Sequence, residues 1–297
     1  MDLVVGVDES DASLTAVRWA AGMAKERRRG LRLVHAVDEI PVTYPHIHPA
    51  YQDLHRLISA RGRRVLRHAK AAAAEVAPDV KPEIVLRPER PAHALLAESR
   101  TAAMLILGTP GLRPLGRIVL GSASVALAAQ AECPVALVRP HVADDAPPDR
   151  GPVVLGVDGA PAGEDAIAIA FEEASWRQAP LVAIHCWHTG FLAEVFEEGG
   201  WTMDTIAIER HECELLAQRL AGWQEKYPDV SVDQIVRQGR STRELLGWAD
   251  RAQLLVVGSR GRGWLAGLTL GSTSQAMMSY ALCPVIVARG RSLPHRK

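Results

Sequence analysis

Two glycine-rich segments of the chain share one spacing of residues. GTPGLRPLGRIVLGS begins at Gly108 and GSRGRGWLAGLTLGS begins at Gly258, and both read as glycine, two residues, glycine, nine residues, glycine and serine. Each segment lies between an apolar run and a stretch with helical patterning. Glycine lets backbone N–H groups approach an anion without a Cβ in the way, and the start of a helix adds its dipole. The spacing therefore indicates a phosphate-binding loop that occurs twice.

Other interpretations of these loops stay open. The glycines also suit tight turns and close helix packing, and the final serines, Ser122 and Ser272, also suit simple helix caps. The sequence contains no G-x-x-x-x-G-K followed by Ser or Thr, and GRGWLAG misses the G-x-G-x-x-G spacing. The sequence therefore does not favour P-loop hydrolysis or NAD chemistry.

Other residues that could take part in catalysis or binding stand near the start of each half. Asp8 in GVDES and Asp158 in GVDGA both follow an apolar run. Ser10 invites a nucleophile hypothesis, but no histidine stands at a spacing that would form a catalytic triad, so we expect no catalytic residue. The histidines of HIHP, His46 and His48, lack a third ligand at a diagnostic spacing, so we expect no metal site.

The two halves of the chain are repeats of one another. Moving the sequence by 150 positions, the offset from Gly108 to Gly258, places Asp8 on Asp158 and His35 on His185. One offset with no net insertion indicates a duplicated domain. RPHVADDAPPDRG between the halves is proline-rich and polar, as in an exposed linker. We therefore expect one domain over residues 1–147 and a second over residues 148–297.

Each half alternates short apolar runs with longer helical stretches. The first half gives LVVGV, a helix over 13–28, LRLVHAV, a helix over 51–77, EIVLR, AMLILG and VALV, and the second half repeats this order. Continuous apolar strands separated by helices predict a parallel sheet covered on both faces. We expect two tandem doubly wound α/β domains of five strands each, with ligands at the carboxyl ends of the strands.

The composition is that of a soluble globular protein. The chain has 297 residues, 48% of them hydrophobic, and its 34 basic and 34 acidic residues cancel. A net charge of zero does not favour nucleic acid, and no apolar stretch is long enough to span a bilayer. The chain opens on a strand pattern in place of a signal peptide, so we expect a cytoplasmic protein. We expect its four cysteines, which form no C-x-x-C pair, to be reduced.

The paired motifs resemble those of the universal stress protein family. GVDES and GVDGA after the first strand, with the glycine spacing after the fourth, occur in both halves, so that the chain resembles the tandem form of that family over nearly its whole length. The resemblance implies strand order 3-2-1-4-5 in each domain, binding of ATP with or without Mg²⁺, and pairing of domains through their last strands.

The same resemblance implies which residues bind the nucleotide. Asp8 and Asp158 would contact the adenosine portion, Gly6 and Gly156 would let it approach, and the loops would wrap the triphosphate. In the first half the expected loop residues are Gly108, Thr109, Gly111, Arg117, Gly121 and Ser122. In the second half they are Gly258, Ser259, Arg260, Gly261, Arg262, Gly263, Gly271, Ser272 and Thr273.

The two loops differ at one position that bears on affinity. Pro110 has no backbone N–H, whereas Arg260 at the same place offers one to a phosphate oxygen. A hydrogen bond to a charged group is worth roughly 1.5 to 3 kcal/mol. We therefore expect the second half to bind ATP more tightly than the first.

Three classes of function remain. The first is an ATP-binding regulator in stress or slow growth, and the second is a slow ATPase or a nucleotidyl or phosphoryl transferase. The third is a domain pair that has lost its nucleotide. Fast phosphoryl transfer needs a positioned base and a well-held Mg²⁺, and the loops contain no paired carboxylates. We expect a non-enzymatic regulator, and we expect a homodimer because the fifth strands would otherwise be exposed sheet edges.

Overall fold

The chain folds into two compact units. The computed structural model describes residues 1–38, 48–110, 120–140, 146–160, 163–189, 199, 204–259 and 270–289. The first unit comprises Met1–Pro147 with Arg289–Lys297, and the second comprises Pro148–Ala288. The sequence predicts one nucleotide-binding domain over residues 1–147 and another over residues 148–297, and this assignment remains a prediction.

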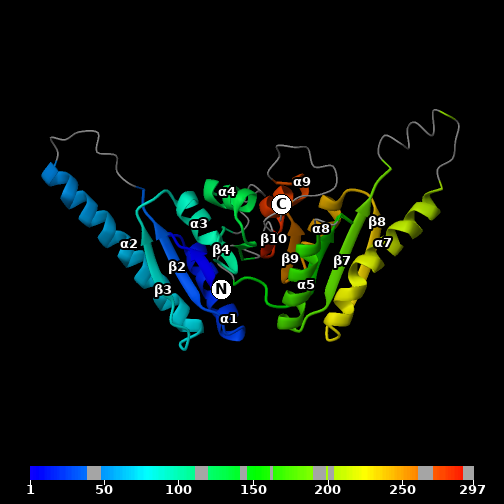
Figure 1. Ribbon diagram of the computed structural model, residues 1–297, viewed down its shortest axis with the longest axis horizontal. Coiled ribbons are helices and arrows are strands. Elements are labelled where there is room, and N and C mark those ends of the chain that lie inside the picture. Colours follow the sequence, from blue (N-terminus) through cyan, green and yellow to red (C-terminus); the bar gives the residue numbers. More distant parts are fainter. Residues whose placement is uncertain are drawn as a thin grey trace, which may run out of the picture. The chain divides into compact units, whose positions relative to one another are not determined.

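The first unit is a parallel sheet of five strands with helices packed on it. Its strands lie in the order β3-β2-β1-β4-β5, and the register of the central strand pairs Leu3 with Leu31 on one side and with Met104 on the other. Figure 1 shows α2 lying along β2 and β3. The elements are β1 Leu3–Gly6, α1 Asp11–Glu26, β2 Leu31–Ala36, α2 His48–Val76, β3 Glu83–Arg87, α3 Pro91–Ser99, β4 Met104–Gly108, α4 Ser122–Gln130 and β5 Val135–Val138.

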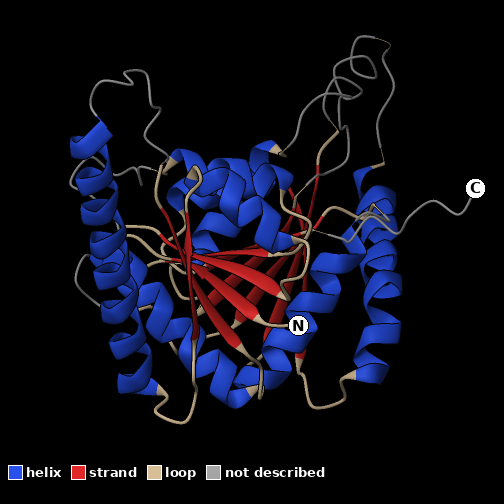
Figure 2. Cartoon of the chain, turned by 60° about the vertical axis from the view of Figure 1, so that its left-hand side comes forward, coloured by secondary structure: helices blue, strands red, loops and turns tan. Residues whose placement is uncertain are grey.

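The second unit repeats this arrangement. Its strands lie in the order β8-β7-β6-β9-β10 and are parallel. In the view of Figure 2, helices lie on both sides of the strands of the chain. The doubly wound fold with strand order 3-2-1-4-5 is therefore confirmed for each unit. The elements are β6 Val153–Val157, α5 Glu164–Arg177, β7 Leu181–Trp187, α7 Thr205–Lys226, β8 Val232–Gln238, α8 Ser241–Ala249, β9 Leu254–Gly258, α9 Ser272–Tyr280 and β10 Val285–Ala288.

Helix limits differ from the sequence expectation by a few residues. The helix expected from residue 13 begins at Asp11, because Ser10 acts as its N-cap and accepts a hydrogen bond from the backbone N–H of Ser13 at 3.2 Å. It ends at Glu26, and Arg28 adopts a left-handed φ of 49°. The cap at Ser10 thus fixes the start of the first helix at Asp11, shortly after Asp8.

The two units carry side chains of different size at three equivalent positions. Phe171 is fully buried in the second unit, and its ring centroid lies 6.2 Å from that of Trp223 and 5.9 Å from that of Tyr227. At the positions 150 residues earlier the first unit has three fully buried alanines, Ala21, Ala73 and Ala77. The first helix pair therefore packs through methyl groups where the second packs through rings.

The cysteines are free thiols in the structure. Cys133 and Cys283 are buried, and burial raises the pKa of the Cys186 thiol to about 11. A thiol with that pKa stays protonated at neutral pH and is a poor nucleophile. Among the described helices, none combines the length and the apolar character that a membrane span requires.

Candidate functional site

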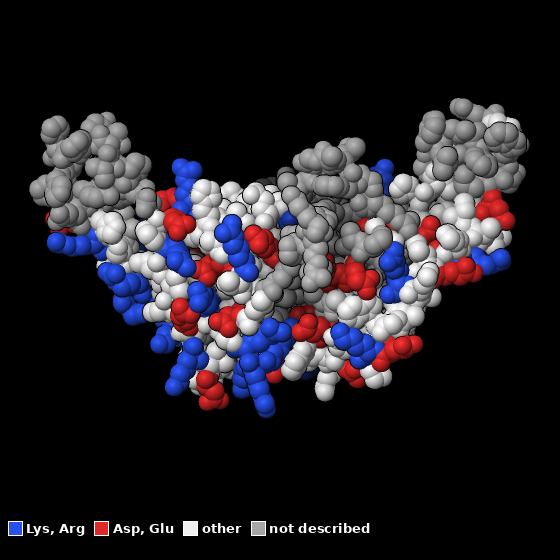
Figure 3. Space-filling view, viewed as in Figure 1, with Lys and Arg blue, Asp and Glu red and all other residues white. Residues whose placement is uncertain are grey.

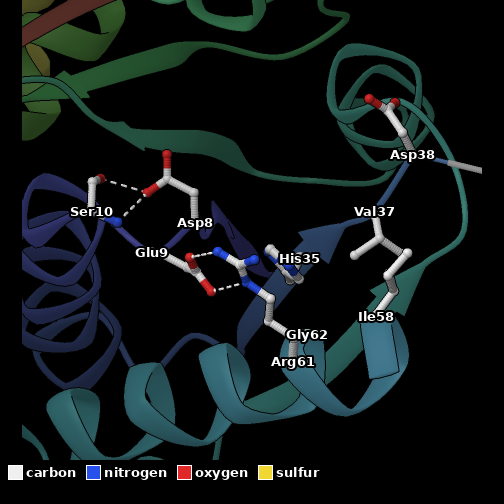
Figure 4. A pocket seen from close by; sticks show the side chains of 9 residues that line it. All are labelled: Asp8, Glu9, Ser10, His35, Val37, Asp38, Ile58, Arg61 and Gly62. Atoms are coloured by element: carbon white, nitrogen blue, oxygen red, sulfur yellow. Dashed lines mark hydrogen bonds and ion pairs between the residues drawn. The ribbon is translucent and has the colours of Figure 1, made fainter. Parts of the chain in front are cut away.

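Asp8 organises the turn that follows the central strand of the first unit. Its Oδ1 accepts hydrogen bonds from the backbone N–H of Ser10 at 2.9 Å and from the Ser10 hydroxyl at 2.5 Å. In Figure 4 the second oxygen, Oδ2, points away from Ser10. Because Ser10 also caps α1, one carboxylate oxygen supports the helix start and leaves the other at the exposed edge of the sheet.

Asp158 has the same arrangement in the second unit. Its Oδ1 accepts a hydrogen bond from the backbone N–H of Ala160 at 2.9 Å. Its Oδ2 is buried and finds no hydrogen-bond partner among the described residues. A buried carboxylate oxygen without a donor is costly, so this atom is suited to accept a hydrogen bond from a ligand.

A cavity opens beside Asp8. It has a volume of about 650 Å³, and its wall includes His35, Val37, Ile58 and Gly62 (Figure 4). The residues come from the ends of β1 and β2 and from one face of α2. The cavity thus lies at the carboxyl edge of the sheet, where parallel α/β folds bind ligands.

An ion pair crosses this cavity. Arg61 of α2 donates two hydrogen bonds to Glu9, from Nε to Oε1 and from Nη2 to Oε2 (Figure 4). This bidentate contact lowers the pKa of Glu9 and raises that of Arg61. Sequence reasoning missed both residues, because the partners lie 52 positions apart and neither belongs to a recognisable motif.

Several glycines expected to face a ligand face protein atoms. A Cβ on Gly108 would lie 2.0 Å from the backbone oxygen of Ala12. A Cβ on Gly6 would lie 2.7 Å from Leu107, and one on Gly156 would lie 3.0 Å from Leu245. Close packing therefore explains these glycines. Their role in binding stays a prediction, and the space beside them is already filled.

The hydroxyl residues of the loops need two corrections. Thr109 is buried, and its backbone N–H and hydroxyl both donate to the carbonyl oxygen of Val138, so its side chain does not face a phosphate site. Ser122 and Ser272 are the first residues of α4 and α9 and do not cap them, because the caps are Gly121 and Gly271. Both serines are exposed and keep their hydroxyls at the helix start.

The remaining expected residues divide between the edge and the loops. Gly258 accepts a hydrogen bond from the Ser274 hydroxyl at 2.5 Å, and Thr273 contacts the hydroxyl of Ser241 at 3.1 Å. The backbone oxygen of Ser259 accepts from the N–H of Gly271 at 2.9 Å, which joins the two ends of the second loop. The expected residues Gly111, Arg117, Arg260, Gly261, Arg262 and Gly263 lie outside the described residues.

Charged residues of both signs mix on one face of the molecule (Figure 3), and metal-ligating residues form no cluster in the described part of the chain. On the face in Figure 3, basic and acidic side chains are interspersed. Arg56 of α2 is 74% exposed and pairs with Asp53. No cluster of three His, Cys, Asp or Glu residues that could hold a metal ion occurs within the described ranges, and His46 lies outside them.

The fold and its edge define a tandem pair of doubly wound α/β domains, each with an aspartate after its central strand. The model of the universal stress protein family matches residues 1–139 and again residues 150–289. The chain therefore belongs to the universal stress protein family.

Proteins similar to this chain carry the same family name. A universal stress protein of Mycobacterium tuberculosis is 41% identical over 294 residues, covering 97% of this chain and 96% of the relative. A second one from that organism is 38% identical over 296 residues, with the same coverage. The crystal structure of a universal stress protein from Archaeoglobus fulgidus has a TM-score of 0.70 at 19% identity and covers 98% of both chains, which supports the fold.

Proposed function

We propose that this chain binds ATP, with or without Mg²⁺, and acts in the cytoplasm as a nucleotide-dependent regulator in stress or slow growth. The observation that carries the proposal is the pair Asp8 and Asp158. In each, Oδ1 accepts a hydrogen bond from the turn after the central strand, and Oδ2 is directed elsewhere or lacks a donor. Amino and hydroxyl groups of an adenosine would supply donors to these oxygens.

The phosphates would lie beside the starts of α4 and α9. Both helices begin after a glycine cap, which has no side-chain acceptor for the first N–H groups. Both also place an exposed serine hydroxyl at the helix start. A helix start with unsatisfied N–H groups favours an anion. The expected contacts of Gly121, Ser122, Gly271 and Ser272 belong to this proposal.

We expect Asp8→Asn to weaken ATP binding by about tenfold to a hundredfold. The amide oxygen can still support the turn, whereas the amide nitrogen replaces an acceptor with a donor. Calorimetric titration of nucleotide-stripped protein with ATP and Mg²⁺ measures the change. Asp79→Asn, in an exposed turn of the first unit, is the matched control. Absence of ATP binding in the unaltered protein, or unchanged affinity in the Asp8→Asn variant, would contradict the proposal.

The alternative is a slow ATPase or transferase. We expect turnover of bound ATP below about one per second, at the lower limit of ordinary enzymes. The physical reason is that no paired carboxylates stand in the loops to position a base and Mg²⁺. Release of phosphate from purified protein measures it, and faster turnover would favour the enzyme.

We also propose a homodimer. Exposed strand edges tend to pair, and last strands that pair within one chain would leave another surface for the dimer. Light scattering should give about twice the mass of the 32.1 kDa chain. A mass of one chain at every protein concentration would remove this part of the proposal.

A further inference from the structure

The two units hold a histidine in the same backbone contact. His35 Nδ1 lies 2.7 Å from the carbonyl oxygen of Val7, and His185 Nδ1 lies 2.8 Å from that of Val157. A carbonyl oxygen only accepts hydrogen bonds, so Nδ1 must carry the proton in both rings. The two histidines therefore differ in what surrounds the second ring nitrogen, Nε2.

In the second unit a glutamate of the same unit occupies the space beyond the ring. Nε2 of His185 lies 2.8 Å from Oε2 of Glu212 on α7. The His185 side chain is 1% exposed and that of Glu212 is 13% exposed. Trp187, which is also buried, stands where the first unit has Val37. Two larger side chains thus take up volume at this edge of the second sheet.

In the first unit the position of Glu212 is a glycine. Gly62 lies 150 positions before Glu212 on α2, and a Cβ there would stand 2.6 Å from Cδ1 of Leu86 and 3.0 Å from Cδ2 of His35. Both residues therefore face the histidine of their own unit. Nε2 of His35 has no hydrogen-bond partner within the described ranges, and the ring borders the cavity of about 650 Å³.

The cavity wall matches a flat base that carries an amino group. Val37 and Ile58 supply apolar surface, while Asp8 and Asp38 supply carboxylate oxygens (Figure 4). Because Nδ1 of His35 donates to the carbonyl oxygen of Val7, the tautomer that makes this contact has its acceptor at Nε2. A ligand that enters must donate hydrogen bonds and bury an apolar face, as the adenine ring of ATP does.

We propose that the base of the nucleotide enters only the first unit, where Nε2 of His35 accepts a hydrogen bond from its amino group. In the second unit Glu212 occupies the corresponding position and excludes the base. The inference rests on the proposed nucleotide binding and names its place. It reverses the order of affinity expected from Pro110, because the proline removes one phosphate contact whereas Glu212 takes the volume of the base.

The test is the stoichiometry of ATP binding to the nucleotide-stripped full chain, measured by calorimetry with Mg²⁺. We expect about one ATP per chain. Gly62→Glu copies Glu212 into the first unit and should weaken that site by more than about tenfold. Gly222→Glu is the matched control, because it makes the same exchange on α7 where no atom lies within 4 Å of the new Cβ, and it should leave binding unchanged.

A reciprocal variant separates exclusion from misfolding. Glu212→Gly combined with Trp187→Val should raise the stoichiometry to about two, since it gives the second unit the residues of the first. Circular dichroism tests whether each variant is folded. Two equal sites in the unaltered protein, or a folded Gly62→Glu variant with full affinity, would overturn the inference and leave nucleotide binding intact. A folded reciprocal variant that still binds one ATP would overturn the exclusion by Glu212. Absence of binding in the unaltered protein would remove the inference together with the proposed function.

Discussion

Gly108→Ala is expected to destabilise the first unit by about 3 kcal/mol, the upper end of the usual cost of overpacking. The new Cβ would lie 2.0 Å from the backbone oxygen of Ala12 and 2.6 Å from the backbone nitrogen of Ser13. These atoms belong to the first turn of α1 and cannot rotate away as the end of a side chain can. Either α1 must shift or β4 must bend.

Hydrogen exchange measures this loss separately in each unit. Amides of β4 should exchange more than about a hundredfold faster, which corresponds to 2.7 kcal/mol or more, while those of β9 serve as an internal reference. Gly121→Ala is the control, because the atom nearest its Cβ is 4.0 Å away. Equal protection of β4 in both variants would show that α1 adjusts without cost. Because Gly108 is fixed by packing, an exchange there cannot serve as a test of phosphate binding.

Phe171→Ala should destabilise the second unit by about 3 to 5 kcal/mol. The ring is fully buried on α5 beside Trp223 and Tyr227, so its loss removes buried apolar surface and leaves a cavity between helices. Urea unfolding followed by circular dichroism measures the change. Ile206→Ala on α7 is the control, because Ile206 is 70% exposed and should change stability by less than about 0.5 kcal/mol. A similar loss in both variants would mean that the aromatic cluster is not a local core.

The sequence predicted the strands because duplication repeats their pattern twice, and the resemblance to the universal stress protein family implied their order. Apolar runs such as LLVV and the aspartates that follow the central strands appear at the same offset in both halves. The carboxyl edge as the place of the site follows from that order. The positions of Asp8 and Asp158 in the turns after the central strands agree with it.

The residues that distinguish the two edges could not be found in the same way. Duplication appears in the sequence as identical residues at one offset, and Gly62 and Glu212 differ. Each lies on a helix rich in charged residues, where one more glycine or glutamate carries no signal. Their meaning depends on contact with His35 and His185 across 27 residues, which only the folded chain supplies.

Thr109 is a residue that the motif indicates but whose side chain the structure directs elsewhere. The motif places it beside Gly108 in the loop, but in the structure it still belongs to the edge of the strand. Its backbone N–H and hydroxyl both bond the carbonyl oxygen of Val138. A motif position therefore identifies the loop without showing which of its side chains is directed toward a ligand.

Three alanines in the first unit stand where the second unit has three aromatic residues, and this difference bears on how the two halves diverged. If both halves descend from one ancestral domain, three positions in mutual contact came to differ in size between the halves. Exchanging one of them alone leaves either a void or a clash, and residues in contact do not contribute additively. We therefore expect the three residues to be exchangeable only together. A chimaera that transplants α5 into the first half without residues 223 and 227 should be less stable than either parent.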